Sequence, residues 1–196
     1  MLNSADIVKW NSDKHYLKEI ADAGLKIIPT AFTGQFDSSY FERFNTKTLI
    51  VKPCISGASR NTFKISATDP WPEMNGPIMI QPFMPQINEE GEWSLVFLGG
   101  KFSHALVKTP AKEDFRSQPE FGGSLQAKQP TAYLLQAAAR YVAEFAKGCL
   151  YARVDGLMVD DEFYLMELEL IDPYLFLSTY PAGYENYFEA LKNLLK

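Results

Sequence analysis

The feature that most constrains the fold is the alternation Glu167-Leu168-Glu169-Leu170 near the C-terminus. Alternate side chains of an extended strand share a face, so the two glutamates lie on one face, about 6.6 Å apart along the strand. Met166, Leu168 and Leu170 then face the other way, into packing. We therefore expect a strand with one apolar face and one face that carries paired carboxylates.

A hairpin is the expected setting of this strand. Residues 151–159 also predict a strand, and residues 160–162 form the turn between the two. Folding the chain back at this turn brings Arg153 and Asp155 near the glutamates. Three carboxylates in an apolar neighbourhood repel one another unless cations compensate them. Oxygen ligands suit Mg²⁺, which completes its coordination shell with water and substrate phosphates.

The alternative for the glutamate pair is the solvated face of an amphipathic strand, the commoner outcome for an isolated Glu-x-Glu. The flanking segments, Leu165-Met166 before the pair and residues 170–177 after it, are too apolar for an ordinary solvated face. We therefore expect the glutamates to be embedded and to bind a cation.

Composition sets the class of protein. The chain has 196 residues, of which 46% are hydrophobic and 22% charged. This length and composition are typical of an ordinary globular protein of one large or two small domains. A net charge of −5 argues against a nucleic-acid binder but not against a nucleotide binder. Cys54 and Cys149 lack metal-ligand spacing, which favours small core residues in a reducing compartment. No signal peptide or membrane span is recognisable, so the cytoplasm is the expected location.

The remaining pattern predicts an α+β fold with mainly antiparallel strands. Helices are expected at residues 16–21, capped by residues 11–13, and at 37–44, 131–147 and 183–195. Strands are expected at residues 25–28, 48–52, 63–65, 77–81, 92–98 and 101–108, with Gly99-Gly100 as a hairpin turn. His104 within a strand is expected to be structural. Residues 109–129 form a long loop, which is usually functional or mobile.

The small-residue segment from Ser56 to Asn61 follows Lys52 at a strand end. Such loops let backbone N–H groups approach phosphate oxygens, and the lysine adds a positive charge. The segment matches no Walker pattern, and most loops of this composition simply turn the chain.

Taken together, the chain resembles the ATP-grasp superfamily, most closely the catalytic half of prokaryotic glutathione synthetases. The resemblance rests on segments that occur in the family's order: KHYLKEIADAGLKIIPT, LIVKPCISGAS, IMIQPFMPQINEEGEWSLVFLGGKFSHALVKTP, DFRSQPEFGGS, YARVDG and YLMELELIDP. It implies a nucleotide sandwiched between two α+β subdomains. It also implies a carboxylate–amine ligase that phosphorylates an acid with ATP and then joins it to an amine, with ATP and Mg²⁺ as cofactors and Mn²⁺ as an alternative cation.

The resemblance also implies site residues. The phosphate-binding residues would be Lys52, Ser56, Gly57 and Ser59, and the adenine hinge would be Gln81, Pro82, Phe83 and Met84. Glu92 would bind ribose, with Glu89 or Glu90 as competitors for that role. Lys108 and Arg153 would act on the transferred phosphoryl group and the acyl phosphate, and Arg116 with Gly122-Gly123 would form the substrate-side loop. The metal ligands would be Asp155, Glu167 and Glu169.

Two positions depart from the family pattern. Glu169 stands where the last metal motif usually has asparagine, which adds a negative charge and affects the choice of cation. Ser94 stands where glutathione synthetases usually carry arginine, so glutathione itself is not implied as the product.

The expected organisation is a linking part at 1–48, a small ATP-grasp subdomain at 49–85 and a metal-bearing subdomain at 86–196. The separate α/β domain that normally begins these ligases is absent from the chain, so the chain is either a fragment or a protein that lost this domain. The expected partners are small acids and amino acids or peptides, with no nucleic acid or membrane, and a homo-oligomer is left open. The alternative to a ligase is a Mg-ATP-binding module without an acceptor pocket.

Overall fold

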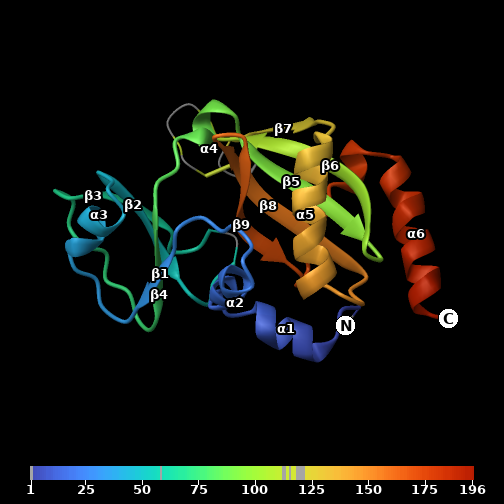
Figure 1. The fold of residues 1–196 in the computed structure, drawn as a ribbon, viewed down its shortest axis with the longest axis horizontal. Helices are drawn as coiled ribbons and strands as arrows, with labels where there is room; N and C mark the ends of the chain where they lie inside the picture. The colour runs from blue at the N-terminus through green and yellow to red at the C-terminus, as the bar shows by residue number, and fades with distance from the viewer. Residues whose placement is uncertain (1, 58, 112–113, 115, 118–121) are drawn as a thin grey trace. The chain divides into compact units, whose positions relative to one another are not determined.

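The chain divides into two compact units, Met1–Asn11 with Gln86–Lys196, and Ser12–Pro85. The computed structural model describes residues 2–57, 59–111, 114, 116–117 and 122–196 (Figure 1). Each unit contains one antiparallel sheet with helices beside it, which confirms the expected α+β class. The three-part division expected from the sequence stays a prediction.

The smaller unit, Ser12–Pro85, is built on a four-stranded sheet in the order β1-β4-β2-β3. Its strands are β1 (Ala31–Thr33), β2 (Thr48–Pro53), β3 (Phe63–Ser66) and β4 (Ile78–Pro82), and its helices are α2 (Tyr16–Asp22) and α3 (Ser39–Arg43). Alternate apolar residues of β2 and β4 meet in the core, namely Leu49, Val51, Ile78 and Ile80, with Ile65 from β3. The period-2 pattern therefore determines which residues of β2 are buried, whereas β4 is buried on both faces from Ile78 to Gln81.

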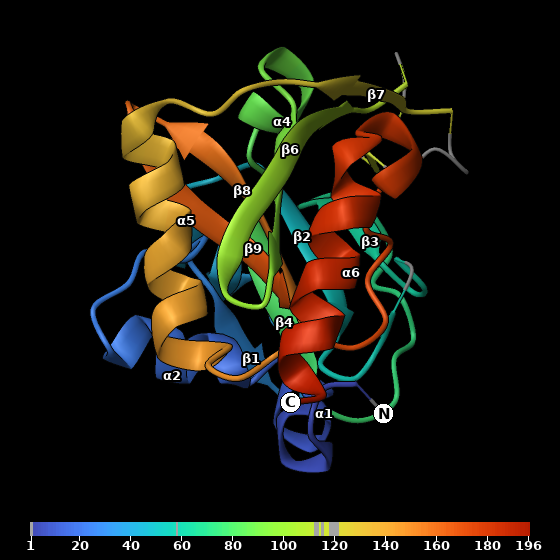
Figure 2. The same ribbon diagram turned by 90° about the vertical axis from the view of Figure 1, so that its right-hand side faces the viewer.

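The larger unit contains a five-stranded sheet in the order β7-β6-β5-β8-β9. Its strands are β5 (Glu92–Leu98), β6 (Lys101–Thr109), β7 (Ser124–Ala127), β8 (Tyr151–Val159) and β9 (Glu162–Glu169). Its helical segments are α1 (Ala5–Asn11), α4 (Gln86–Glu89), α5 (Ala132–Phe145), the short 3-10 helix η2 (Leu177–Thr179) and α6 (Ala182–Leu194). Figure 2 shows α5 and α6 running alongside these strands.

The two faces of this sheet differ in what covers them. Helix α5 packs on one face, where Tyr141 contacts the Phe163 ring edge to face. Helix α6 packs on the other face, where Ala190 joins a core cluster with Val96 and Leu98. Ser94 is two residues before Val96 in the same strand, so it lies on the same α6 face. Residues paired across an antiparallel ladder share a face, so Asp155, the partner of Ser94, lies there too. Polar side chains gather on the same face, since Glu92, Lys108 and Asp155 lie there together with buried Leu106.

A bulge in β9 changes the expected side-chain alternation. Asp155 pairs with Glu167 while Gly156 pairs with Leu165, so Met166 is an extra residue in the ladder. Leu165 and Leu168 are therefore both buried despite their odd spacing. The prediction that Met166 shares the apolar face of Leu168 and Leu170 did not anticipate this bulge, because a strict period of two has no place for an extra residue.

Several local predictions need correction. Residues 25–28 do not form a strand; the strand is Ala31–Thr33, which begins after Pro29. The N-cap position of α2 is His15, which makes no side-chain cap bond, and Asn11 ends α1; of residues 11–13, Asp13 accepts from the His15 amide just before the helix. Residues 160–161 alone form the hairpin turn, both with positive φ, as a two-residue turn between strands requires. Strand β7 lies inside the segment expected to be a loop, and its mostly exposed residues gave no apolar signal.

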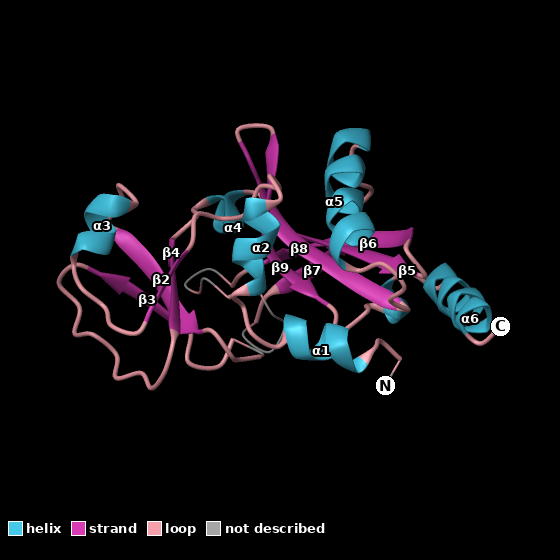
Figure 3. Ribbon diagram, turned by 60° about the horizontal axis from the view of Figure 1, so that its bottom comes forward, coloured by secondary structure: helices cyan, strands magenta, loops and turns pink. Residues whose placement is uncertain are grey.

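Helix α1 lies close to the N-terminus (Figure 3). Two buried asparagines, Asn3 and Asn11, attach it and its preceding residues to the sheet. Asn3 donates to the carbonyls of Tyr151 and Leu170 and accepts from the Leu150 amide. Asn11 donates to the Leu168 carbonyl at 2.8 Å and accepts from the Leu170 amide at 2.9 Å. Strand β9 is at the edge of the sheet and has no neighbouring strand on its outer side. The Asn11 side-chain amide takes the place of that strand by bonding to the backbone groups on both sides of Glu169.

We predict that Asn11→Ala lowers the free energy of unfolding by about 2 kcal/mol, because it leaves the Leu168 carbonyl and the Leu170 amide without their partner. Urea unfolding measures this loss. The matched control is Asn193→Ala, an exposed asparagine near the C-terminus, for which we expect a change within about 0.5 kcal/mol. Equal stability of the two variants would contradict the role of Asn11 at the strand edge.

Candidate functional site

The β8–β9 hairpin brings together the charged residues expected from the sequence. Arg153 pairs with Glu169 and Asp155 pairs with Glu167 in the ladder, so all four side chains lie on one face. On the same face, β5 and β6 add Glu92 and Lys108, which are paired with each other. We call these six residues the charged cluster: Glu92, Lys108, Arg153, Asp155, Glu167 and Glu169.

Asp155 is the centre of the charged cluster and is only 2% exposed. Its Oδ1 accepts a hydrogen bond from Ser94 Oγ at 2.6 Å, and its Oδ2 lies 3.2 Å from Lys108 Nζ and 2.8 Å from an Arg153 guanidinium nitrogen. Burial alone would raise the pKa of Asp155, but the neighbouring Arg153 and Lys108 charges outweigh burial and lower the pKa to about 2. Asp155 is therefore an anion held by two cations.

Lys108 is buried between two carboxylates. Its Nζ lies 2.7 Å from Glu92 Oε1, and Ser117 Oγ donates to the other oxygen of Glu92. Burial disfavours the charged amine, but Asp155 and Glu92 more than compensate and raise the pKa of Lys108. The Ser117 contact also attaches the segment after β6 to the cluster.

The pKa of Glu169 is shifted in the opposite direction to that of Asp155. Arg153 donates to both carboxylates, yet burial together with the Glu167 and Asp155 charges outweighs the guanidinium and raises the pKa of Glu169 to about 8. The six side chains of the cluster comprise four carboxylates and two cations, which gives a formal charge of −2 when all are ionised. A proton or a cation near Glu167 and Glu169 relieves this excess.

The donors on this face fit a hard divalent cation, because all of them are carboxylate oxygens. Glu167 and Glu169 are half-buried and reachable from solvent, whereas Asp155 already accepts from Ser94, Lys108 and Arg153. For Asp155 to ligate a metal directly, one of these donors has to be released.

Apart from Glu92 of β5, the nucleotide-binding residues expected from the sequence lie in the smaller unit. Lys52 is in β2, opposite Met79 of β4, and Ser56, Gly57 and Ser59 follow this strand. Ala58, which falls within the expected phosphate loop, lies outside the described residues. Ser59 adopts a positive φ of 53°, so the loop turns sharply there.

The expected adenine hinge continues from β4. Gln81 is buried and donates to Thr30 Oγ1 at 2.9 Å, and Pro82 ends the strand before Met84. The Phe83 amide donates to the Thr48 carbonyl at 3.0 Å, so this N–H is already used inside the sheet. Backbone recognition of a base by this segment must therefore use other groups of the hinge.

Arg116 lies one residue before Ser117, in the segment that follows β6. It forms an ion pair with Asp114 at 2.8 Å and is a third exposed, although its neighbour Ser117 reaches Glu92. The expected loop also includes Gln118, which lies outside the described residues, and Gly122, which has a positive φ. Its role on the substrate side stays a prediction.

Three polar residues of these regions were not singled out as site residues by the sequence. Ser94 interrupts an otherwise apolar strand two residues after Glu92, a signal that could have placed it beside the acids. Ser117 carried no recognisable signal. Lys64 of β3 lies with its Nζ 3.7 Å from the centre of the Phe83 ring. A prediction that β3 pairs with β2 could have placed Lys64 close to the expected nucleotide site.

The sequence predicted purely structural roles for His104 and for the two cysteines. His104 bonds to Ser103 and to the Leu175 carbonyl, and burial lowers its pKa, as a structural histidine requires. Cys54 and Cys149 are buried and not disulfide-bonded. None of the helices in the described residues is long and apolar enough to cross a membrane.

Comparison with known proteins identifies the fold. No protein-family model matches the chain. The chain is similar to the cycloserine biosynthesis protein DcsG of Streptomyces lavendulae, with 25% identity over the whole chain and 74% of that protein. The crystal structure of D-cycloserine synthetase DcsG superposes with a TM-score of 0.82 at 22% identity, again over 100% of this chain and 74% of that one.

Two other solved structures show the same architecture. D-alanine–D-alanine ligase from Bacillus anthracis, complexed with ATP, has a TM-score of 0.68 at 16% identity, covering 94% of this chain and 65% of the ligase. The ATP-grasp ligase PsnB, complexed with a precursor variant, Mg and ADP, has a TM-score of 0.72 at 18% identity, covering 100% and 62%. The chain therefore has the ATP-grasp fold, its relatives are ATP-grasp ligases, and it spans about two thirds to three quarters of their length.

The charged cluster predicts how stability depends on pH. The folded-state pKa of Glu169, about 8, lies above its ordinary value of 4.5, so between these values the folded protein holds a proton that the unfolded chain has lost. Stability without Mg²⁺ should therefore fall as pH rises from 5 to 8, with a slope of at most about 1.4 kcal/mol per pH unit. Asp155 acts in the opposite direction and only at acidic pH, because its pKa is depressed.

Urea unfolding at pH 5, 6.5 and 8 tests this prediction. We expect Glu169→Gln to flatten the slope, whereas Glu144→Gln, an exposed glutamate of α5, should leave the slope unchanged. A wild-type slope that survives in Glu169→Gln would show that Glu169 is not the responsible group.

Proposed function

We propose that this chain is the ATP-binding catalytic part of an ATP-dependent carboxylate–amine ligase. In this reaction ATP phosphorylates a carboxylate, and an amine displaces phosphate from the acyl phosphate to form an amide or peptide bond. The single observation that supports it most is the charged cluster, in which two buried cations and four carboxylates share one face of a sheet in an ATP-grasp fold. An ordinary stabilising sheet face has no need for such a costly arrangement.

Phosphoryl transfer depends on positioning and on neutralising charge, more than on covalent chemistry by the protein. Lys108 and Arg153 are suited to this task, because their carboxylate partners keep them protonated and hold them in place. In our proposal, Lys108 approaches the phosphoryl group in transfer and Arg153 steadies the acyl phosphate. Lys52 takes up charge on the ATP phosphates.

Glu167, Glu169 and Asp155 would hold Mg²⁺ or Mn²⁺. When bound, the cation would neutralise phosphate oxygens of ATP. Glu167 fits this role without rearrangement of the ion pairs around Asp155, whereas a cation at Glu169 would compete with the Arg153 contact. Glu169 adds a carboxylate where the family usually has an amide, which favours cation binding through charge. Its raised pKa means that the cation replaces a proton at neutral pH.

The smaller unit would bind the adenine and the phosphates. We assign Ser56, Gly57 and Ser59 to the phosphates and the hinge Gln81, Pro82, Phe83 and Met84 to adenine. D-alanine–D-alanine ligase and PsnB have been crystallised with ATP and ADP respectively, which supports a nucleotide as the ligand of this fold.

Glu92 and Arg116 are the least constrained assignments. Glu92 is buried and bonded to Lys108 and Ser117, so binding a ribose would require it to give up the Ser117 contact. Arg116 would act on the substrate side, where the segment 109–129 excludes water from the acyl phosphate. The acid and the amine are small molecules or peptides in our proposal.

A second candidate is a Mg-ATP-binding module without ligase activity of its own. The observation that favours it is length, since the chain spans 62% of PsnB and 74% of DcsG. The two candidates share the nucleotide and metal sites and differ in whether an amine and an acid increase phosphate release.

Nucleotide binding is tested by Lys52→Met, which removes a positive charge but keeps an apolar stem. A charge-assisted phosphate contact contributes about 1.5–3 kcal/mol, so ATP affinity should fall by about one to two orders of magnitude. Isothermal titration calorimetry with Mg-ATP measures the loss. Lys47→Met, an exposed lysine before β2, is the matched control and should bind ATP as the wild type does. Normal ATP binding by Lys52→Met would place the phosphates elsewhere.

Catalysis is tested by phosphate release from Mg-ATP with panels of amino acids and small acids. We expect release that depends on both an acid and an amine, retained in Glu169→Asn and lost in Glu169→Leu, because the asparagine keeps an oxygen ligand. Glu167→Gln should also lose Mg-dependent turnover. ATP binding without any substrate-dependent release would favour the binding module, and full activity in Glu169→Leu would refute the metal assignment.

A further inference from the structure

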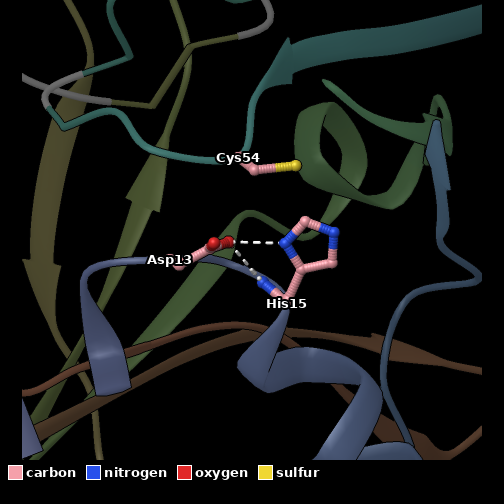
Figure 4. A group of neighbouring side chains, drawn as sticks. All are labelled: Asp13, His15 and Cys54. Atoms are coloured by element: carbon pink, nitrogen blue, oxygen red, sulfur yellow. Dashed lines mark hydrogen bonds and ion pairs between the residues drawn. The ribbon is translucent and has the colours of Figure 1, made fainter. Parts of the chain in front are cut away.

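A second group of metal-binding side chains lies in the smaller unit, apart from the charged cluster. Asp13, His15 and Cys54 each offer one ligand atom, and these atoms lie within 4.8 Å of one another (Figure 4). Asp13 and His15 precede α2, whereas Cys54 follows directly after β2. The distance along the chain hid this group from the sequence, because no short metal-binding motif connects the three.

The three side chains are held in place before any ion binds. Asp13 Oδ1 accepts from the His15 amide at 3.0 Å and lies 2.6 Å from His15 Nδ1. The His15 ring stacks on Phe32, with 4.3 Å between ring centres. Backbone bonds join the two segments, since the Lys14 amide donates to the Cys54 carbonyl at 2.9 Å. A preorganised donor set loses little entropy on binding an ion.

We propose that Asp13, His15 and Cys54 form a Zn²⁺ site. One carboxylate oxygen, one imidazole nitrogen and one thiolate are ligands that zinc accepts together, whereas Mg²⁺ prefers oxygen alone. The carboxylate and thiolate charges balance the 2+ charge of the ion. With Zn–N about 2.0 Å and Zn–S about 2.3 Å, tetrahedral ligands lie roughly 3.5 Å apart. The donor atoms lie within 4.8 Å of one another, and Asp13 Oδ1 is 2.6 Å from His15 Nδ1, so zinc would replace this hydrogen bond as the two atoms separate by about 1 Å.

The site is open on one side and closed on the other. The side chains of His15 and Asp13 are 43% and 41% exposed, whereas Cys54 is buried. An ion can therefore enter from solvent, and water takes the fourth position. The Cys54 thiol loses its proton to solvent as the Zn–S bond forms. Without the ion, burial raises the pKa of the Cys54 thiol to about 11, with the Asp13 charge adding to this effect, so the thiol alone is a poor nucleophile.

Zinc at this position would also affect the neighbouring loop. Lys14 lies between Asp13 and His15 in the sequence, and its Nζ donates to the Ser56 carbonyl at 2.6 Å. Movement of Asp13 and His15 on zinc binding would therefore be passed through Lys14 to the start of the loop that begins at Ser56. This consequence rests on the proposed role of that loop in phosphate binding, and we expect zinc to weaken ATP binding.

Zinc binding to the nucleotide-free protein tests the site directly. Competition against a chromophoric chelator should give one Zn²⁺ per chain, with affinity reduced about 10-fold or more in His15→Gln and Cys54→Ala. Cys149→Ala, the matched control at the other buried cysteine, should bind as the wild type does. Binding of Co²⁺ should produce a thiolate-to-cobalt charge-transfer band that is absent in Cys54→Ala.

His15→Gln keeps the proposal testable even if Cys54→Ala fails to fold, because His15 is a half-exposed residue. Failure of the wild type to bind Zn²⁺, or unchanged affinity in His15→Gln, overturns the site. The effect on ATP is read separately, as a zinc-induced change in ATP affinity that disappears in His15→Gln. If zinc binds while the protein binds no ATP, the metal site stands and the proposed function fails; if zinc leaves ATP affinity unchanged, the coupling to the loop is refuted.

Discussion

The ion pairs around Asp155 are the interaction on which the larger unit depends. A carboxylate that is 2% exposed is tolerated only because Arg153, Lys108 and Ser94 direct donors at it. Those donors come from three adjacent strands, β8, β6 and β5, so the ion pairs hold only in one register of the sheet. A slip of one residue would turn Asp155 into the α5 face, where Leu95 and Val154 are packed. The charge thus selects the register that the apolar face also requires.

How far the sequence predicts this structure varies with the kind of signal. Strands β5, β6 and β8 were predictable because long apolar runs are bounded by glycine or acidic turns. The approach of Arg153 and Asp155 to the glutamates followed from a two-strand hairpin alone and is confirmed. The bulge at Met166 was not predictable, because it depends on Gly156, where a Cβ would lie 2.4 Å from the Tyr164 carbonyl oxygen.

Long-range polar contacts could not be predicted from the sequence for a different reason. Asn3 and Asn11 look like ordinary surface residues near the N-terminus, yet both are buried against backbone groups about 150 residues away. The same holds for Asp13, His15 and Cys54, whose proximity comes from the pairing of the segment before α2 with the residue after β2 through the Lys14–Cys54 backbone bond, and has no local pattern. Periodicity reports which face is apolar; it carries no information on which distant backbone group a polar side chain will satisfy.

Arg153 connects the charged cluster to the segment that follows it. Its guanidinium binds Asp155 and Glu169, donates to the Tyr174 carbonyl at 2.9 Å, and lies 5.5 Å from the centre of the Phe176 ring. Phe176 is buried with a positive φ of 52°, a conformation that a bulky residue keeps only when its surroundings hold it. A cation that takes Glu169 oxygens competes with Arg153 for them, and the guanidinium then has Asp155 and Tyr174 as its remaining partners. Glu169 would therefore do more than add a ligand charge, because it would make the occupancy of the proposed metal site and the position of Arg153 dependent on each other.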